Sequence, residues 1–146
     1  MNFMQQAYCQ AQRAYKKDEV PIGAVVVKDG KVISRAYNKR EKTGDATAHA
    51  EILAIKKACK KIRDFRLVGC DIYVTLEPCT MCMGAILNAR IDNLFFGAYA
   101  NKENNLTCQE INEKAGLNHK TNIVGGVMKD ECEQLIKDYF KCKRTK

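Results

Sequence analysis

Apolar positions along the chain follow a helical spacing in some stretches and form short β-branched runs in others. The helical spacing predicts helices over residues 2–17, 48–60, 78–88, 110–115 and 128–143. The β-branched runs predict strands over residues 20–27, 31–37, 71–76, 91–97 and 121–125. Strands that alternate with helices are typical of α/β proteins, so we expect a mixed sheet of about five strands with helices on both faces.

Local signals mark several of the predicted element boundaries. Asp29 and Gly30 lie between two strand-like runs, which predicts a hairpin turn. Thr47 precedes the second long helix and is a candidate N-cap. Pro78 is predicted to lie in the first turn of the third helix, where a missing N–H is tolerated. Because no linker or repeat interrupts the pattern, we expect one domain over residues 1–146.

Composition narrows the class of protein. The 146 residues are 46% hydrophobic and 29% charged, a balance typical of globular proteins. No apolar run reaches the roughly 20 residues of a membrane helix, and the N-terminal residues lack a signal-peptide pattern. We therefore expect a cytoplasmic protein that does not enter a membrane. Six of the eight cysteines are scattered along the chain, and we expect these to be free thiols, most of them buried.

The chain is basic, with a formal net charge of +8. An excess of this size favours polyanions as partners, and nucleic acid is the first candidate. The sequence leaves open the alternative that the charges only solvate the surface.

Two short motifs carry the candidate chemistry: His49 and Glu51 lie in one, and Cys79 and Cys82 in the other. Cysteines three positions apart on a helix share a face, with Cβ atoms about 5–6 Å apart, which suits two ligands of one metal ion. A structural zinc site takes four protein ligands, often from two such pairs, but the sequence has no second Cys-x-x-Cys. With His49 as the third ligand, one position stays open, which is the pattern of catalytic zinc.

Glu51 completes this interpretation. Two thiolates and a neutral imidazole cancel the charge of the metal dication, so activating a water needs a carboxylate that accepts its proton. Taken alone, His49 can also be interpreted as a packing or surface histidine. The two cysteines alone can also be interpreted as a thioredoxin-type redox pair. A redox pair usually follows the first strand of a βαβ unit and has aromatic, Gly or Pro residues inside the motif. Neither feature is present here.

His-x-Glu followed by Pro-Cys-x-x-Cys is the signature of zinc deaminases. The chain carries further segments in the same order as bacterial tRNA-specific adenosine deaminases, which it resembles over nearly its whole length. These segments are 19–25, Asn38, 47–51, 75–85, 96–98 and 118–119.

The resemblance implies a cytidine deaminase-like fold, a three-layer α/β/α sandwich around a five-stranded mixed sheet, and a homodimer with one zinc ion per chain. It implies hydrolytic deamination of adenosine to inosine at the wobble position of a tRNA anticodon stem-loop. Zinc activates a water that attacks C6, and Glu51 carries its proton to the ring and then to the leaving ammonia.

The resemblance also implies residues that hold the RNA. Asn38 is expected to bond the imidazole edge of the adenine, and the backbone of Ala50 and the side chain of Asn118 to hold the flipped nucleotide. Tyr139 and Phe140 are expected to stack on flanking bases, with the alternative that one or both pack the terminal helix.

The sequence departs from the family at two positions that concern RNA contact. Ala46 stands where relatives often have proline, and Ala100 lies where an acidic side chain often follows Phe-Gly-Ala. The side chain of Ala100 cannot accept a hydrogen bond from a ribose 2′-hydroxyl. The neighbouring Asn101 offers a substitute acceptor.

Two other functions are compatible with the same candidate zinc site. One is deamination of a free base or nucleoside of guanine or cytosine type, which uses the same zinc site. The other is a non-catalytic zinc module that binds nucleic acid, which has no need for Glu51 beside an open metal position.

Overall fold

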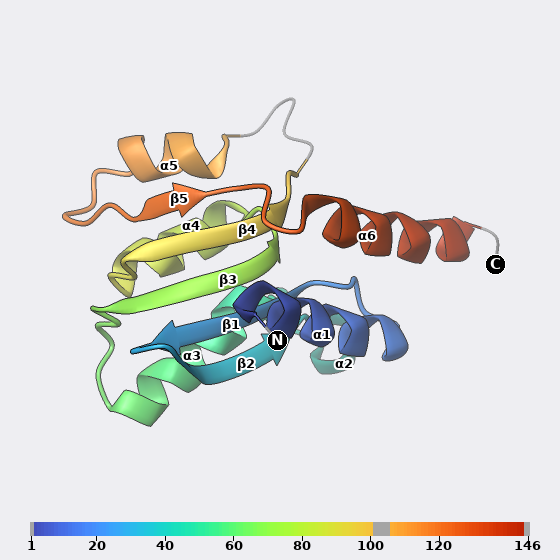
Figure 1. Cartoon of the computed structure of the whole chain (residues 1–146), viewed down its shortest axis with the longest axis horizontal. Coiled ribbons are helices and arrows are strands. Elements are labelled where there is room, and N and C mark those ends of the chain that lie inside the picture. The colour runs from blue at the N-terminus through green and yellow to red at the C-terminus, as the bar shows by residue number, and fades with distance from the viewer. Residues whose placement is uncertain (1, 101–105, 145–146) are drawn as a thin grey trace.

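The computed structural model describes residues 2–100 and 106–144, and its centre is a five-stranded mixed sheet in the order β2-β1-β3-β4-β5 (Figure 1). β1 pairs antiparallel with β2 and β3, whereas β3, β4 and β5 run parallel. The strands are β1 (Gly23–Lys28), β2 (Lys31–Tyr37), β3 (Cys70–Leu76), β4 (Asn93–Ala98) and β5 (Asn122–Val124).

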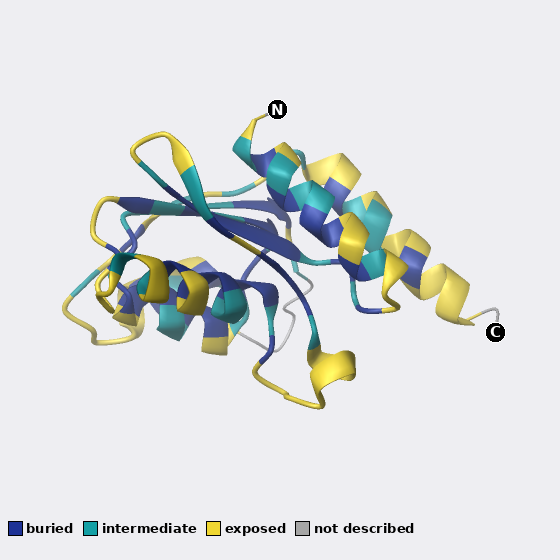
Figure 2. Cartoon of the chain, turned by 90° about the horizontal axis from the view of Figure 1, so that it is seen from below, coloured by how far each residue is buried: buried dark blue, intermediate teal, exposed yellow. Residues whose placement is uncertain are grey.

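Helices cover both faces of the sheet (Figure 2). One face carries α1 (Phe3–Lys16) and α6 (Lys129–Arg144), and the other carries α3 (Ala50–Ile62), α4 (Thr80–Asn88) and α5 (Cys108–Lys114). A short helix, α2 (Arg40–Thr43), links β2 to α3 and was not predicted. The architecture confirms the expected three-layer α/β/α sandwich. Among the described residues, no helix is both long and apolar enough to cross a membrane.

Two apolar layers follow from the alternation of side chains along the strands. Val26 and Ile72 point toward α3 and α4, whereas Val25 and Tyr73 point toward α1. Because β1 and β3 are covered on both faces, their apolar residues form nearly continuous runs rather than a strict alternation.

Close packing of α1 on β1 fixes the strand that begins beside the candidate site. A Cβ at Gly23 would collide with the carbonyl oxygen of Ala7 and the backbone nitrogen of Ala11. The N–H of Gly23 donates to Thr75 Oγ1 at 3.1 Å, which ties the start of β1 to the end of β3. The Gly in the Val-Pro-x-Gly-Ala-Val segment is therefore a packing requirement.

Two predicted helix boundaries are wrong. Thr47 is not the N-cap of α3, because its N–H and its hydroxyl both donate to the Asp45 carboxylate, at 2.8 and 2.7 Å. The cap residue is His49. Pro78 likewise lies outside α4, whose cap is Cys79. Both caps have extended backbone and lack a side-chain hydrogen bond to the helix, which leaves their ligand atoms available.

Candidate metal centre and active site

Three side chains from two helix N-termini meet at one point. His49 caps α3, Cys79 caps α4, and Cys82 is the third residue of α4. Their ligand atoms all lie within 4.8 Å of one another. The structure thus brings together the three residues that the sequence singled out.

The distances fit a tetrahedral zinc ion. His49 Nδ1 lies 3.7 Å from Cys79 Sγ and 3.5 Å from Cys82 Sγ. Zinc–sulfur bonds of about 2.3 Å and zinc–nitrogen bonds of about 2.0–2.1 Å at tetrahedral angles give sulfur–nitrogen separations of about 3.6 Å. The three side chains therefore fit one zinc ion, with room for a fourth ligand.

The electrostatics of the site favour anionic sulfur. A hydrogen bond from Cys82 lowers the pKa of Cys79 to about 3, and the bond to His49 acts in the same direction. The same hydrogen bond between the two thiol groups, together with burial, raises the pKa of Cys82. The N-termini of α3 and α4 both face the sulfurs, and their helix dipoles stabilise negative charge there. A bound dication would replace the shared proton and make both sulfurs thiolates.

Glu51 lies in the first turn of α3 and is 4% exposed. Burial raises the pKa of its carboxyl group to about 7, and the group is hydrogen-bonded to Cys82. A carboxyl group in this position is able to hold or release a proton beside the metal ligands.

A small cavity opens next to His49. It is lined by Val20, Ile22, Asn38, Arg40, His49 and Ala50. Asn38 is 4% exposed and held at both ends: its Nδ2 donates to the carbonyl of Val20, and its Oδ1 accepts from the N–H of Arg40, both at 3.3 Å. Asn38 and Ala50 thus share a cavity with the candidate metal ligand His49, which the sequence alone does not show.

Asn118 is not brought to the metal ligands within one chain. It is exposed, and the neighbouring His119 donates from Nε2 to the carbonyl of Ile91 at 2.7 Å. Ile91 precedes β4, so this contact lies at the start of the parallel strands. The metal ligands of α4 follow the opposite end of β3, at Leu76.

Tyr139 and Phe140 have different surroundings on α6. Tyr139 is 7% exposed, donates from its hydroxyl to the carbonyl of Asp18 at 3.1 Å, and packs edge-on against Tyr15. Tyr139 therefore packs α6 against the end of α1, which is the alternative to base stacking that the sequence left open. Phe140 is 44% exposed and accessible to a base.

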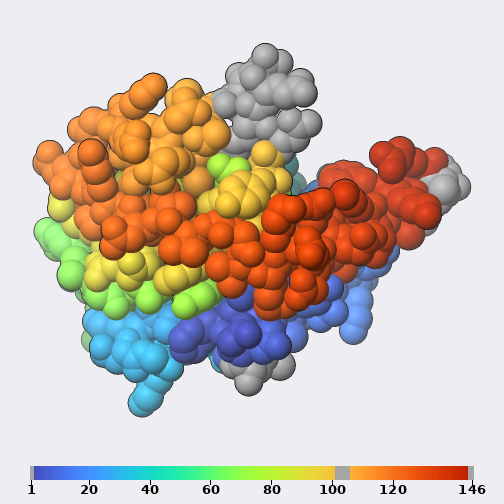
Figure 3. All heavy atoms as spheres, turned by 45° about the horizontal axis from the view of Figure 1, so that its top comes forward, coloured from blue at the N-terminus to red at the C-terminus, as the bar shows by residue number. Residues whose placement is uncertain are grey.

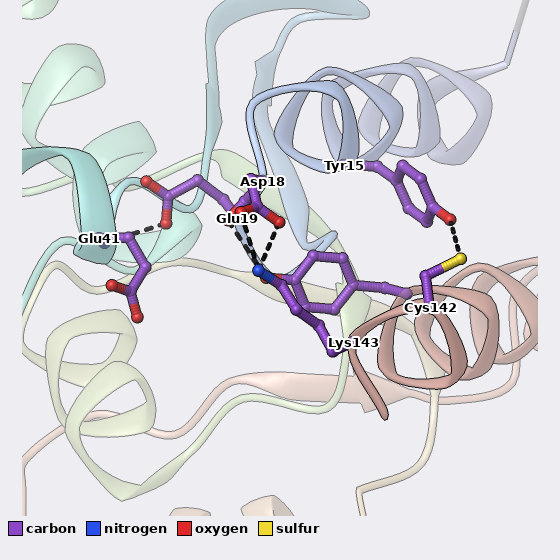
Figure 4. A network of polar contacts seen from close by, with 7 residues as sticks. Tyr15, Asp18, Glu19, Glu41, Cys142 and Lys143 are labelled. Carbon is purple, nitrogen blue, oxygen red and sulfur yellow. Dashed lines mark hydrogen bonds and ion pairs between the residues drawn. The ribbon is translucent and has the colours of Figure 1, made fainter. Parts of the chain in front are cut away.

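Contacts at the α1–β1 corner dock the end of α6 (Figure 4). Lys143 Nζ lies 2.7 Å from Asp18 Oδ1, and the hydroxyl of Tyr15 lies 3.4 Å from Cys142 Sγ. The C-terminal part of α6 extends away from the sheet at one end of the molecule (Figure 3). Lys143 thus has a partner within the chain, which reduces its availability for RNA.

Two buried carboxylates shape the site and were not predicted from the sequence. Glu19 is 1% exposed and accepts from the backbone N–H groups of Glu41 at 3.0 Å and Lys42 at 2.7 Å, which holds α2 beside the cavity. Glu77 accepts from the N–H groups of Ala100 at 3.2 Å and Cys108 at 3.0 Å. Both glutamates belong to the motif segments, but no local period reveals these long-range bonds. Asn101 lies outside the described residues.

The fold and the three-ligand centre define a deaminase domain. The family model of MafB19-like deaminases matches residues 1–134. The tRNA-specific adenosine deaminase of Bacillus subtilis (strain 168) is 41% identical over 145 residues, which cover 99% of this chain and 90% of that protein. The chain therefore belongs to the deaminase family that includes the bacterial tRNA-specific adenosine deaminases.

Solved structures support the same placement. One comes from a study of A-to-I editing by tRNA:A34 deaminases at the wobble position of transfer RNA. It matches with a TM-score of 0.85 and 41% identity, over 91% of this chain and 97% of that one. Guanine deaminase from Bacillus subtilis matches with a TM-score of 0.66 and 29% identity, over 100% of this chain and 96% of that one. Both the identity and the TM-score are higher for the tRNA:A34 deaminase.

Proposed function

We propose that this protein is a zinc-dependent tRNA adenosine deaminase that hydrolyses adenosine to inosine at the wobble position of a tRNA anticodon. The observation that carries the proposal is the meeting of His49, Cys79 and Cys82 beside buried Glu51. It occurs in a chain 41% identical, over nearly its whole length, to a tRNA-specific adenosine deaminase.

One zinc ion per chain is the metal we assign to the centre. Zinc suits two thiolates and one imidazole in tetrahedral geometry. When bound there, it supplies a Lewis acid that lowers the pKa of a water. His49, Cys79 and Cys82 hold it, and Glu51 stays free of the ligand set.

Glu51 is the proposed general acid and base. Replacing the C6 amino group of adenosine by oxygen consumes one water and releases one ammonia, so a proton must pass from the water to the purine ring and a second to the leaving amine. A buried carboxyl with a pKa of about 7 suits both directions of transfer near neutral pH. The position of Glu51 in the first turn of α3 keeps its carboxyl group within reach of the reacting atoms.

The cavity beside His49 is the proposed site of the flipped base. Asn38 has one remaining amide hydrogen and one remaining lone pair on its oxygen, which suits the imidazole edge of a purine. The bonds to Val20 and Arg40 fix its orientation. The backbone of Ala50 lines the same cavity. Exposed Phe140 is the proposed stacking residue for a neighbouring base.

We further propose that residues 1–146 act as one deaminase domain within a homodimer, in the cytoplasm, where the proposed tRNA substrate is found. These points rest on the resemblance to bacterial tRNA-specific adenosine deaminases. Asn118, which lies apart from the metal ligands of its own chain, is proposed to contact RNA only if the partner subunit brings it there. Light scattering of the purified protein measures the oligomeric state.

The test of the function uses four substrates. The purified protein is incubated with an anticodon stem-loop RNA carrying adenosine at the wobble position and, separately, with adenine, guanine and cytidine, while ammonia release is measured. We expect ammonia and inosine from the RNA alone. A stem-loop that already carries inosine is the matched control. Ammonia from guanine or cytidine but none from the RNA would replace the proposal by a free-base or nucleoside deaminase.

A further inference from the structure

The positive charge of the chain is concentrated in one short segment. Residues 56–66 hold six cationic side chains and one carboxylate, a net +5 of the chain's +8. We call this segment the α3 basic patch; it consists of Lys56, Lys57, Lys60, Lys61, Arg63, Asp64, Phe65 and Arg66, all of which are exposed.

Within the described part of the chain, most cations of the α3 basic patch have no acidic partner. Among the residues that the structure describes, the one ion pair within the patch joins Arg66 to Asp64, at 3.4 Å. Lys57 Nζ donates to the carbonyl of Arg35 at 2.7 Å, which is a neutral acceptor. Close like charges of this density repel one another, and a bound polyanion relieves that repulsion.

The terminal helix α6 is different, although it also carries several cations near its C-terminal end. α6 holds five cationic and four acidic side chains, a net +1. Lys129 and Lys137 both pair with Glu133, at 3.5 and 2.8 Å, and Lys143 pairs with Asp18. The charge excess that indicated nucleic acid therefore resides mainly in the α3 basic patch.

α3 joins the basic patch to the candidate site. His49, a candidate metal ligand, is the N-cap of this helix, which runs from Ala50 to Ile62. At 1.5 Å per residue, Lys60 lies roughly 15 Å along the axis from Ala50. An RNA whose loop reaches the cavity can therefore place more distant phosphates along the same helix.

We propose that the α3 basic patch is a second RNA-binding surface, which holds the phosphate backbone of the tRNA outside the anticodon loop. This inference rests on the proposed function. Lysine ammonium groups bind phosphates as point charges and release counterions, which suits a contact that reads no sequence. Phe65 is 60% exposed with the Arg66 guanidinium 4.2 Å from its ring centroid, a flat surface accessible to a sugar or base.

A structural role for the same lysines makes a different prediction. Lys60 and Lys61 lie in the last turn of α3, where cations stabilise the helix dipole by about 0.3–1 kcal/mol. Such a role would change the stability of the protein but not the salt dependence of RNA binding. The salt slope of the affinity therefore separates the two roles.

The experiment measures the affinity for full-length tRNA across a range of salt concentrations. The variant is Lys60→Gln with Lys61→Gln, and Lys60→Arg with Lys61→Arg is the charge-conserving rescue. The matched control is Lys114→Gln with Lys120→Gln, which removes two exposed lysines outside the patch. We expect the glutamine variant to flatten the plot of log affinity against log salt by roughly 1.4–1.8 units. The arginine variant and the control keep the parent slope.

Three results would overturn the inference. The first is a salt slope of the glutamine variant equal to that of the parent. The second is an equal loss of salt slope in the Lys114 and Lys120 control. The third is a patch-dependent attachment to phosphatidylserine vesicles without any change in tRNA binding, which would assign the patch to membrane lipid. Failure of the proposed function is distinguishable, because the parent would then release no ammonia from a stem-loop RNA.

Discussion

Glu19→Gln is the substitution that most directly tests how the fold builds the substrate cavity. Glu19 is almost fully buried, and each of its carboxylate oxygens accepts one backbone N–H of α2, from Glu41 and from Lys42. Glutamine has the same shape but one oxygen fewer and no charge. One N–H of α2 then faces the NH2 group of the glutamine, which cannot accept a hydrogen bond, and the other N–H donates to the neutral amide oxygen.

The magnitude follows from these two bonds. A hydrogen bond to a charged group contributes about 1.5–3 kcal/mol, and a neutral one about 0.5–1.5 kcal/mol. Removing one charged bond and weakening the other costs about 2–4 kcal/mol. Because all four residues of α2 are exposed, we expect this helix to open locally while the sandwich stays folded.

Native-state hydrogen exchange of the Glu41 and Lys42 amides is the assay. A loss of about 2–4 kcal/mol increases their exchange roughly 30- to 1000-fold, since each 1.4 kcal/mol is a factor of ten. Glu41→Gln is the matched control, because that carboxylate is exposed and its side chain takes no part in either bond. Equal exchange in the two variants, or unprotected amides in the parent, would refute the reasoning. Because Arg40 lines the cavity with Asn38, the variant should also raise KM for the stem-loop RNA.

Four further predictions concern the metal, the proton transfer and the RNA. Cys82→Ala should remove zinc and activity together, measured by metal analysis; full zinc occupancy would contradict the ligand assignment. Glu51→Ala should keep zinc and the fold but lower the deamination rate by about 10²–10⁴; a rate within about tenfold of the parent would show that the proton transfer lies elsewhere. Lys141→Gln with Arg144→Gln at the end of α6 should flatten the salt dependence of RNA binding by roughly one unit for each phosphate that the variant no longer binds, and an unchanged slope would mean that these cations are only solvated. Finally, Ala100→Asp should increase discrimination against a deoxyribose before the target adenosine by roughly ten- to a hundredfold, since a charged acceptor for a 2′-hydroxyl contributes about 1.5–3 kcal/mol; equal discrimination in the parent would show that position 100 does not contact the sugar.

Local sequence signals were sufficient for the five strands of the described residues and for the longer helices, although not for α2. The Asp29-Gly30 turn formed where it was predicted: a type I′ hairpin turn has positive φ at both central positions, and these are 51° and 73°. The spacing of Cys79 and Cys82 already placed two sulfurs on one helical turn. His49 was joined to them by the chemistry of a three-ligand zinc site rather than by any local pattern.

Local signals failed at the starts of α3 and α4. Thr47 and Pro78 have the better intrinsic preferences for a helix start, but the helices begin later, after His49 and Cys79. The extended backbone of an N-cap directs these two side chains to a common point. Tertiary packing of the two helices on the sheet thus outweighed propensities of about 1 kcal/mol.

The sequence by itself determined the layered α/β pattern, the ligand types and the basic charge of this protein, since these depend on residue identity and short spacing. Only the tertiary structure decided which side chains surround the site. Glu19 reaches α2, Tyr139 and Lys143 reach the α1–β1 corner, and Asn118 lies apart from the metal ligands of its own chain. The physical reason is that a hydrogen bond or ion pair between residues distant in the chain leaves no period in the sequence. It exists only once the sheet order has brought its two partners together.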